Sequence, residues 1–158
     1  MTQKADFNAD EWTTLVNAPA LVAALVIAAD RGGRVRESLA AQRAYAEAGA
    51  SSPGELLLAI LATPAAIGLA EAPRTPEDLR RVAPETLRRA VGLLEQRATD
   101  AEVVEYKRFV FGLADRVARA HREGGFLGIG GTEISEHEQE ALDEIAAIFD
   151  EVQSAEES

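Results

Sequence analysis

The chain has no cysteine among its 158 residues. This absence excludes disulfide bonds, thiolate nucleophiles, and zinc or iron–sulfur sites with cysteine ligands. It also suits the reducing cytoplasm, where we expect the protein to reside. Histidine is nearly as scarce: only His121 and His137 are present, and neither belongs to a metal-binding motif such as His-Glu-x-x-His.

Long hydrophobic runs are missing as well. The two most apolar segments, 18–29 and 56–70, are about 12 and about 15 residues long, whereas crossing a bilayer takes roughly 20. The opening residues are polar and do not form the basic end and apolar middle of a secretory signal. We therefore predict no transmembrane segment and assign both apolar segments to core helices.

Positive charge is in short supply. The formal net charge is −11, and no lysine or arginine follows Glu133. Binding to nucleic acid needs clustered cations, so we predict no nucleic-acid partner. One predicted helix does carry several arginines, but acidic residues interleave with them, which is typical of a solvated helix face. These arginines are Arg80, Arg81, Arg88 and Arg89.

The pattern of apolar residues is helical throughout. No window alternates apolar and polar residues as a half-buried strand does. Apolar residues instead recur at three- and four-residue steps, and the longest such stripe contains Val103, Tyr106, Val110, Leu113 and Val117. We predict an all-α fold, a bundle or orthogonal array of six to eight helices in a single domain over residues 1–150. An acidic tail over residues 151–158 is expected to follow.

Helix starts and ends are marked by capping residues, prolines and glycines. Proline favours the first turn of a helix and disrupts its interior, so we expect a new helix to start near Pro19 and a break at Pro84. Four residue pairs have the spacing of a capping box, in which two side chains satisfy each other's end groups. These pairs are Asn8 with Glu11, Ser52 with Glu55, Thr99 with Glu102, and Ser135 with Glu138.

A glycine-rich segment, 124–131, interrupts the pattern with five glycines around Phe126, Leu127 and Ile129. A phosphate cradle is one interpretation, but no strand precedes the segment and no Gly-Lys-Ser or Gly-Lys-Thr closes it. A second interpretation is a tight loop that turns its apolar side chains into the core. A third is an exposed apolar tip that docks on a partner, which makes these three residues the candidate interaction loop.

Catalytic motifs are lacking. The chain has no serine in a Gly-x-Ser-x-Gly turn and no histidine with an evident acidic partner. Pairs of carboxylates do not indicate acid–base catalysis either, because 27 acidic residues on helices form such pairs by chance. We name no catalytic residue and expect a protein that is not an enzyme.

Several motifs together resemble a family of uncharacterised bacterial helical proteins. The family opens with Phe-x-x-x-Glu-Trp, continues with Ala-Pro-x-Leu-Val, and closes with Glu-Gly-Gly-Phe-Leu-Gly-x-Gly-Gly followed by Ser-x-x-Glu. In this chain the motifs occupy residues 7–12, 18–22, 123–131 and 135–138. The resemblance covers most of the chain and implies a bacterial helical protein, without assigning an activity.

Two helix junctions, 28–37 and 130–138, also resemble those of the TerB-like helical fold associated with tellurite resistance. Each reads as a helix end, a glycine turn, a β-branched residue and a helix that opens with glutamate. In that fold, acidic residues at two junctions bind divalent metal. The resemblance therefore implies metal ligation by Asp30, Glu37, Glu133 and Glu138.

Two functional hypotheses follow. The first is a non-enzymatic protein-interaction module of the bacterial cytoplasm that binds a protein partner or a second copy of itself and needs no cofactor. Its candidate surfaces are the candidate interaction loop and the acidic C-terminal helix. The alternative is a stress-response protein of the TerB-like type that binds a divalent metal or a small ligand.

Overall fold

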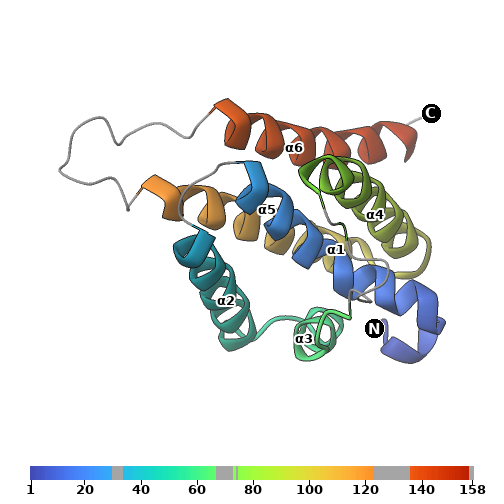
Figure 1. Cartoon of the computed structure of the whole chain (residues 1–158). Coiled ribbons are helices and arrows are strands. Elements are labelled where there is room, and N and C mark those ends of the chain that lie inside the picture. Colours follow the sequence, from blue (N-terminus) through green and yellow to red (C-terminus); the bar gives the residue numbers. More distant parts are fainter. Residues whose placement is uncertain (30–33, 67–72, 74, 123–135, 157–158) are drawn as a thin grey trace.

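The structure is a computed structural model that describes residues 1–29, 34–66, 73, 75–122 and 136–156. These residues form six α-helices and a short 3-10 helix, and none of them lies in a strand (Figure 1). The predicted all-α bundle is confirmed. The elements are η1 (Lys4–Asp6), α1 (Ala9–Ala29), α2 (Arg34–Ala50), α3 (Glu55–Ala62), α4 (Pro76–Arg97), α5 (Asp100–Arg122) and α6 (Glu136–Glu156).

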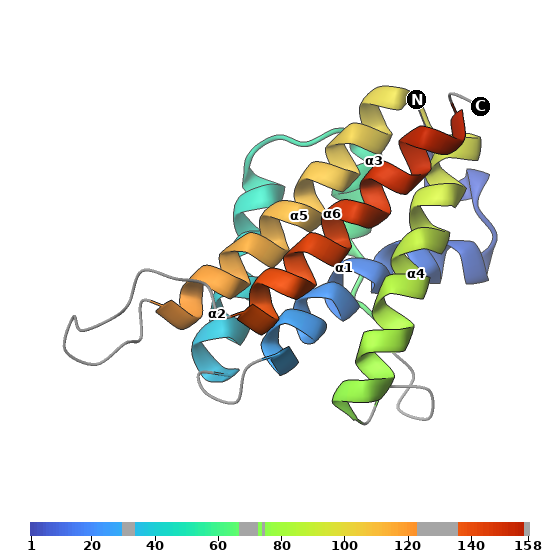
Figure 2. The ribbon, with the colours of Figure 1, turned by 90° about the horizontal axis from the view of Figure 1, so that it is seen from above.

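Helix α1 is the centre of the bundle and packs against all five other α-helices. Seen from above, α6 crosses over α1 between α4 and α5 (Figure 2). Helix α2 packs along α5, and the short α3 contacts α1, α2 and α5. Every α-helix contributes side chains to the main core cluster, because each has an apolar stripe that only neighbouring helices can cover. The stripe predicted from Val103 to Val117 is buried along its whole length.

Helix α1 runs without a break through Pro19, so the predicted start of a second helix there is wrong. Proline has no N–H group, and in a helix interior it leaves the carbonyl four residues earlier without its usual donor. That carbonyl belongs to Leu15, and the buried hydroxyl of Tyr106 donates a hydrogen bond to it at 2.8 Å. A side chain from α5 thus takes the place of the missing backbone donor, which allows the apolar surface of α1 to continue.

The predicted break at Pro84 is also wrong, because α4 is continuous from Pro76 to Arg97. Here the carbonyl that loses its donor belongs to Arg80, an exposed residue at which water can serve as donor. Pro84 itself is buried and adds to the apolar face of the helix. In both helices, burial of a long apolar surface outweighs one missing backbone hydrogen bond.

The N-terminal end of α1 follows the predicted capping pattern. Asn8 Oδ1 accepts a hydrogen bond from the N–H of Glu11 at 2.9 Å, and Glu11 Oε2 accepts one from the N–H of Asn8 at 2.8 Å. Phe7 and Trp12 pack across this cap with their ring centroids 6.1 Å apart. Arg97, at the end of α4, reaches back to Glu11 at 2.8 Å and fixes this corner to the bundle.

The predicted capping box of Ser52 and Glu55 does not form. Gly54 is the residue before α3, no side chain caps the helix, and Ser52 has a positive φ of 57°. The backbone N–H of Gly54 instead donates to Glu105 on α5 at 2.9 Å, so a tertiary contact takes over the role of a local cap. At the other end of the chain, α6 continues to Glu156 and therefore extends into the predicted acidic tail.

Uninterrupted passage through Pro19 makes α1 longer than the sequence suggested. The helix has 21 residues, and the mean hydropathy of an 18-residue window within it reaches 1.8, so α1 is long and apolar enough to cross a membrane by length and composition alone. The same properties belong to the central helix of a bundle, and α1 has buried residues from Trp12 to Val26.

The start of α5 is tied to the N-terminus through Glu102. Its carboxylate accepts hydrogen bonds from the N–H of Thr99 at 2.9 Å, and from the N–H and hydroxyl of Thr2 at 3.0 and 2.7 Å. Desolvation is the largest single influence on the pKa of Glu102 and raises it, but the hydrogen bonds from Thr99 and Thr2 together outweigh it and lower the pKa to about 2.

Replacing Glu102 by glutamine is expected to lower the free energy of unfolding by about 1 to 2 kcal/mol at pH 7. Because folding lowers the pKa of Glu102 from 4.5 to about 2, its stabilisation is complete above pH 4.5 and is lost as the pH falls toward 2. Urea unfolding of the wild type and of Glu102→Gln between pH 7 and 2 measures the difference between their free energies of unfolding. This difference should narrow as the pH falls from 4.5 toward 2. An equal pH dependence for wild type and E102Q would contradict the assignment, and the exposed Glu144→Gln serves as control.

Candidate functional site

The described helix ends that flank the two similar junctions lie at the same end of the molecule. Helix α1 ends at Ala29 and α2 begins at Arg34, while α5 ends at Arg122 and α6 begins at Glu136. All four helix ends lie at the left of Figure 1, and the view from above agrees (Figure 2). Helices α1 and α5 each pack against both α2 and α6.

Two carboxylates at this end are buried. Glu37, on the first turns of α2, is 1% exposed, and Glu138, on the first turn of α6, is 0% exposed. Among the residues that the structure describes, no other charged residue is classed as buried. Both carboxylates take part in polar or electrostatic interactions. A buried carboxylate costs several kcal/mol unless partners compensate its charge, so the burial of two at one end indicates a specialised position.

Helix capping explains only one of the two. Glu138 is the third residue of α6, the position from which a capping-box glutamate reaches back to the start of its helix. Glu37 is the fourth residue of α2, one position too late for that role. The burial of Glu37 therefore needs a reason other than capping.

The other sequence-predicted site residues lie outside the described residues. This applies to Asp30 and Glu133, the remaining members of the proposed metal set, and to the candidate interaction loop of Phe126, Leu127 and Ile129. Within the described ranges, no three or more histidine or acidic side chains gather in a group that could hold a metal ion. The structure thus places two of the four predicted ligands and leaves the interaction loop as a prediction.

Histidine adds little to this end of the molecule. The ring of His137 is 69% exposed, and its Nδ1 lies 3.8 Å from the carboxylate of its neighbour Glu140. The side chain of His121 lies outside the described part of the chain. A hollow of about 420 Å³ between α1, α4 and α6 includes His137, Glu140 and Arg80, whose charges are of mixed sign. It therefore shows no preference for one kind of ion.

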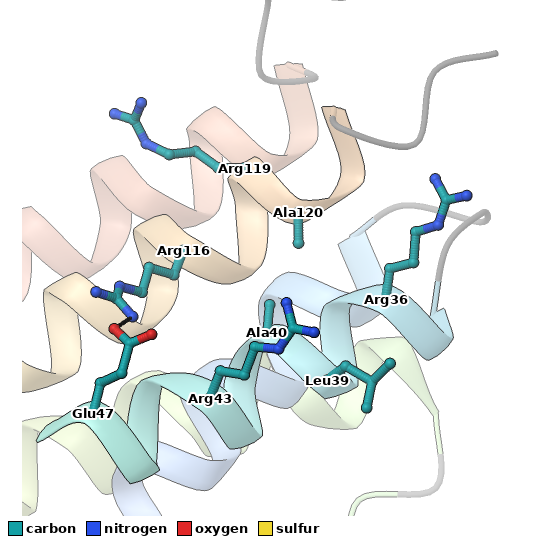
Figure 3. A pocket seen from close by; sticks show the side chains of 8 residues that line it. All are labelled: Arg36, Leu39, Ala40, Arg43, Glu47, Arg116, Arg119 and Ala120. Carbon is teal, nitrogen blue, oxygen red and sulfur yellow. Dashed lines mark hydrogen bonds and ion pairs between the residues drawn. The ribbon is translucent and has the colours of Figure 1, made fainter. Parts of the chain in front are cut away.

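A basic groove lies between α2 and α5, beside the same end of the bundle (Figure 3). It has a volume of about 470 Å³ and is lined by four arginines, two from each helix. One carboxylate, Glu47, lines it as well and forms an ion pair with Arg116 across the groove. The four residues are Arg36 and Arg43 on α2 and Arg116 and Arg119 on α5.

The groove arginines do not cluster in the sequence, unlike the arginines of α4. Arg80, Arg81, Arg88 and Arg89 are all exposed on α4, as predicted for a solvated face. The groove arginines are far apart in the chain, and only the packing of α2 on α5 brings them together. Their spacing, seven residues on α2 and three on α5, places each pair on one helix face and was the available signal.

A second groove, of about 480 Å³, is mostly apolar and lies between α1, α2 and the end of α3. Tyr45 lines it and packs edge-on against Phe109, with ring centroids 5.2 Å apart. Burial raises the pKa of Tyr45 to about 12, so its hydroxyl stays protonated at physiological pH. Residues 67–72, which follow this groove in the chain, lie outside the described residues.

Comparisons with known proteins add no relative: no protein-family model matches the chain, and neither curated proteins nor solved structures give a match.

Proposed function

We propose that the protein binds a divalent cation at the end of the bundle where α2 and α6 begin, with Glu37 and Glu138 as two of the ligands. The observation that carries this proposal is the burial of both carboxylates at one end of the bundle, at 1% and 0% exposure. Both residues also belong to the ligand set that the TerB-like resemblance implies. Their burial distinguishes them from the many acidic residues that lie on exposed helix faces.

The burial of both carboxylates favours a cation as a ligand. A carboxylate that is shielded from water gains more from a bound cation than an exposed one does. A divalent cation that both glutamates bind would compensate both charges at once. Calcium and magnesium prefer oxygen ligands, and carboxylates are the usual side chains that supply them.

The helices give the two carboxylates fixed positions. Each glutamate stands near the N-terminal end of its helix, where the helix dipole favours negative charge. A carboxylate has two oxygens with about four acceptor sites in total, so a capping role for Glu138 leaves room for a cation. Asp30 and Glu133 flank the same helix ends in sequence and are the further ligands that we propose.

The test is the thermal stability of protein stripped with a chelator and then titrated with Mg²⁺, Ca²⁺ or Mn²⁺. At a free cation concentration ten times the Kd, binding adds about 1.4 kcal/mol to the free energy of unfolding and raises Tm by about 3 to 5 °C. Glu37→Gln with Glu138→Gln should abolish this increase. The matched control is Glu77→Gln with Glu85→Gln, two exposed positions on α4, which should keep it.

A second measurement covers the case in which the double variant does not fold. Mn²⁺ added to the wild-type protein should broaden the amide signals at the starts of α2 and α6 before those of α3 and α4. If no divalent ion changes Tm and Mn²⁺ broadens all helices alike, the protein has no cation site at this end and the proposal is wrong.

A further inference from the structure

The geometry points to the groove between α2 and α5 as a binding site for a small phosphorylated molecule. This inference goes beyond cation binding and does not depend on it. It rests on three observations: the arginines that line the groove, the charge of the rest of the protein, and the apolar wall beside the arginines (Figure 3).

Two of the groove arginines have no carboxylate partner within the described part of the chain. Arg116 pairs with Glu47, and a further ion pair occupies the fourth arginine, Arg119. Arg36 and Arg43 form no ion pair or hydrogen bond with any described residue. They stand two helical turns apart on α2, about 10.5 Å along the axis, a distance that two arginine side chains can bridge toward one ligand.

Phosphate is the chemistry that fits these side chains. The guanidinium group is planar, remains charged at all physiological pH values, and donates two parallel hydrogen bonds to phosphate oxygens. A phosphate monoester carries close to two negative charges at pH 7, which matches the two uncompensated arginines. Neighbouring Glu47 competes with such a ligand for Arg116, because the ion pair and the ligand use the same guanidinium group.

Size and overall charge favour a compact ligand over a nucleic acid. The groove of about 470 Å³ lies within the usual range for small-molecule sites, roughly 300 to 1,000 Å³. A long polyanion would extend beyond the groove onto a protein whose net charge is −11 and would be repelled. A small anion would contact only the positively charged groove.

The groove also offers an apolar contact for the organic part of the ligand. Leu39 is 47% exposed, and with Ala40 and Ala120 it lines the groove beside the arginines (Figure 3). An exposed leucine next to uncompensated arginines suits a phosphate ester better than inorganic phosphate alone. Phenyl phosphate therefore serves as the probe.

The experiment is a titration of isotope-labelled protein with phenyl phosphate in the presence of a chelator, followed by NMR. We expect saturable shifts confined to amides of α2 and α5. Arg36→Gln with Arg43→Gln should weaken binding at least tenfold, and Glu47→Gln should strengthen it about threefold because Arg116 is released. The matched control, Arg81→Gln with Arg89→Gln on the exposed face of α4, removes the same charge and should change the affinity less than twofold.

Three results would overturn the proposal. One is the absence of saturable binding by the wild-type protein. Another is a loss of affinity in the α4 control as large as that of Arg36→Gln with Arg43→Gln, which would mean a general effect of net charge. The third is tighter binding of a short oligonucleotide than of phenyl phosphate at the same groove. Because a chelator is present throughout, failure here leaves the cation proposal intact, and failure of the cation test leaves this one intact.

Discussion

Replacing Leu113 by alanine is expected to lower the free energy of unfolding by about 3 to 4 kcal/mol. Leu113 is 1% exposed at the middle of α5, the helix that packs on all five others. Loss of its side chain removes apolar contacts and leaves a cavity that helices fixed on several sides cannot close. Urea unfolding followed by far-ultraviolet circular dichroism measures the change through a lower midpoint at an unchanged m value.

The matched control is Val104→Ala on the same helix. Val104 is an exposed hydrophobic residue, so its truncation should change the free energy of unfolding by no more than about 0.5 kcal/mol. An effect of that small size at Leu113 would show that the buried face of α5 has been assigned incorrectly.

Replacing Tyr106 by alanine is expected to cost about 4 kcal/mol, because the ring is fully buried between α1 and α5. Tyr106→Phe keeps the ring and removes only the hydroxyl. That change should cost about 2 kcal/mol, since the carbonyl of Leu15 has already lost its helical donor at Pro19 and would be left buried without a partner. The same urea titration measures both variants.

Pro19→Ala tests whether the Tyr106 hydroxyl compensates for the donor that the Leu15 carbonyl lacks. Alanine supplies the N–H that proline lacks, so the carbonyl of Leu15 regains a helical donor and depends less on Tyr106. In the Pro19→Ala background, Tyr106→Phe should cost about 1 kcal/mol less than in the wild-type background, which a double-mutant cycle measures directly. Equal costs in both backgrounds would show that the hydroxyl does not compensate for the proline.

Local sequence signals predicted much of the helical fold. The starts of α1 and α5 agree with their capping residues, and the hydrogen bonds of Asn8 with Glu11 and of Thr99 with Glu102 are present. The buried stripe of α5 agrees with its three- and four-residue spacing. These features depend on residues within one or two turns of each other, and that is the range over which a sequence pattern carries information.

The predictions that failed depend on contacts between distant segments. Pro19 was expected to start a helix because proline favours the first turn. The expectation failed because Tyr106, the donor that replaces the missing N–H, lies on another helix far along the chain. Ser52 lost its expected capping role because Glu105 on α5 binds the backbone of Gly54 instead. In each case a tertiary hydrogen bond supports a conformation that the local sequence pattern disfavours.

The candidate site, too, could be predicted from the sequence only in part. Glu37 and Glu138 could be selected from the sequence, because each stands at a recognisable helix junction, but their burial could not be foreseen. The basic groove could be predicted only in part, since the spacing places each arginine pair on one helix face. The two pairs line one groove only through the packing of α2 on α5, and a sequence pattern does not state which helix faces meet.

The central position of α1 has a consequence for how the protein is made. Helix α1 leaves the ribosome before α4, α5 and α6, the helices that cover most of its apolar surface. At roughly 5 to 20 residues per second, synthesis of the chain from the end of α1 to the end of α5 takes on the order of 10 seconds. During that time this long apolar helix lacks most of its partners and exposes a surface to chaperones or to other nascent chains. The order of the helices, more than their final stability, therefore sets the moment at which this protein is most prone to aggregate.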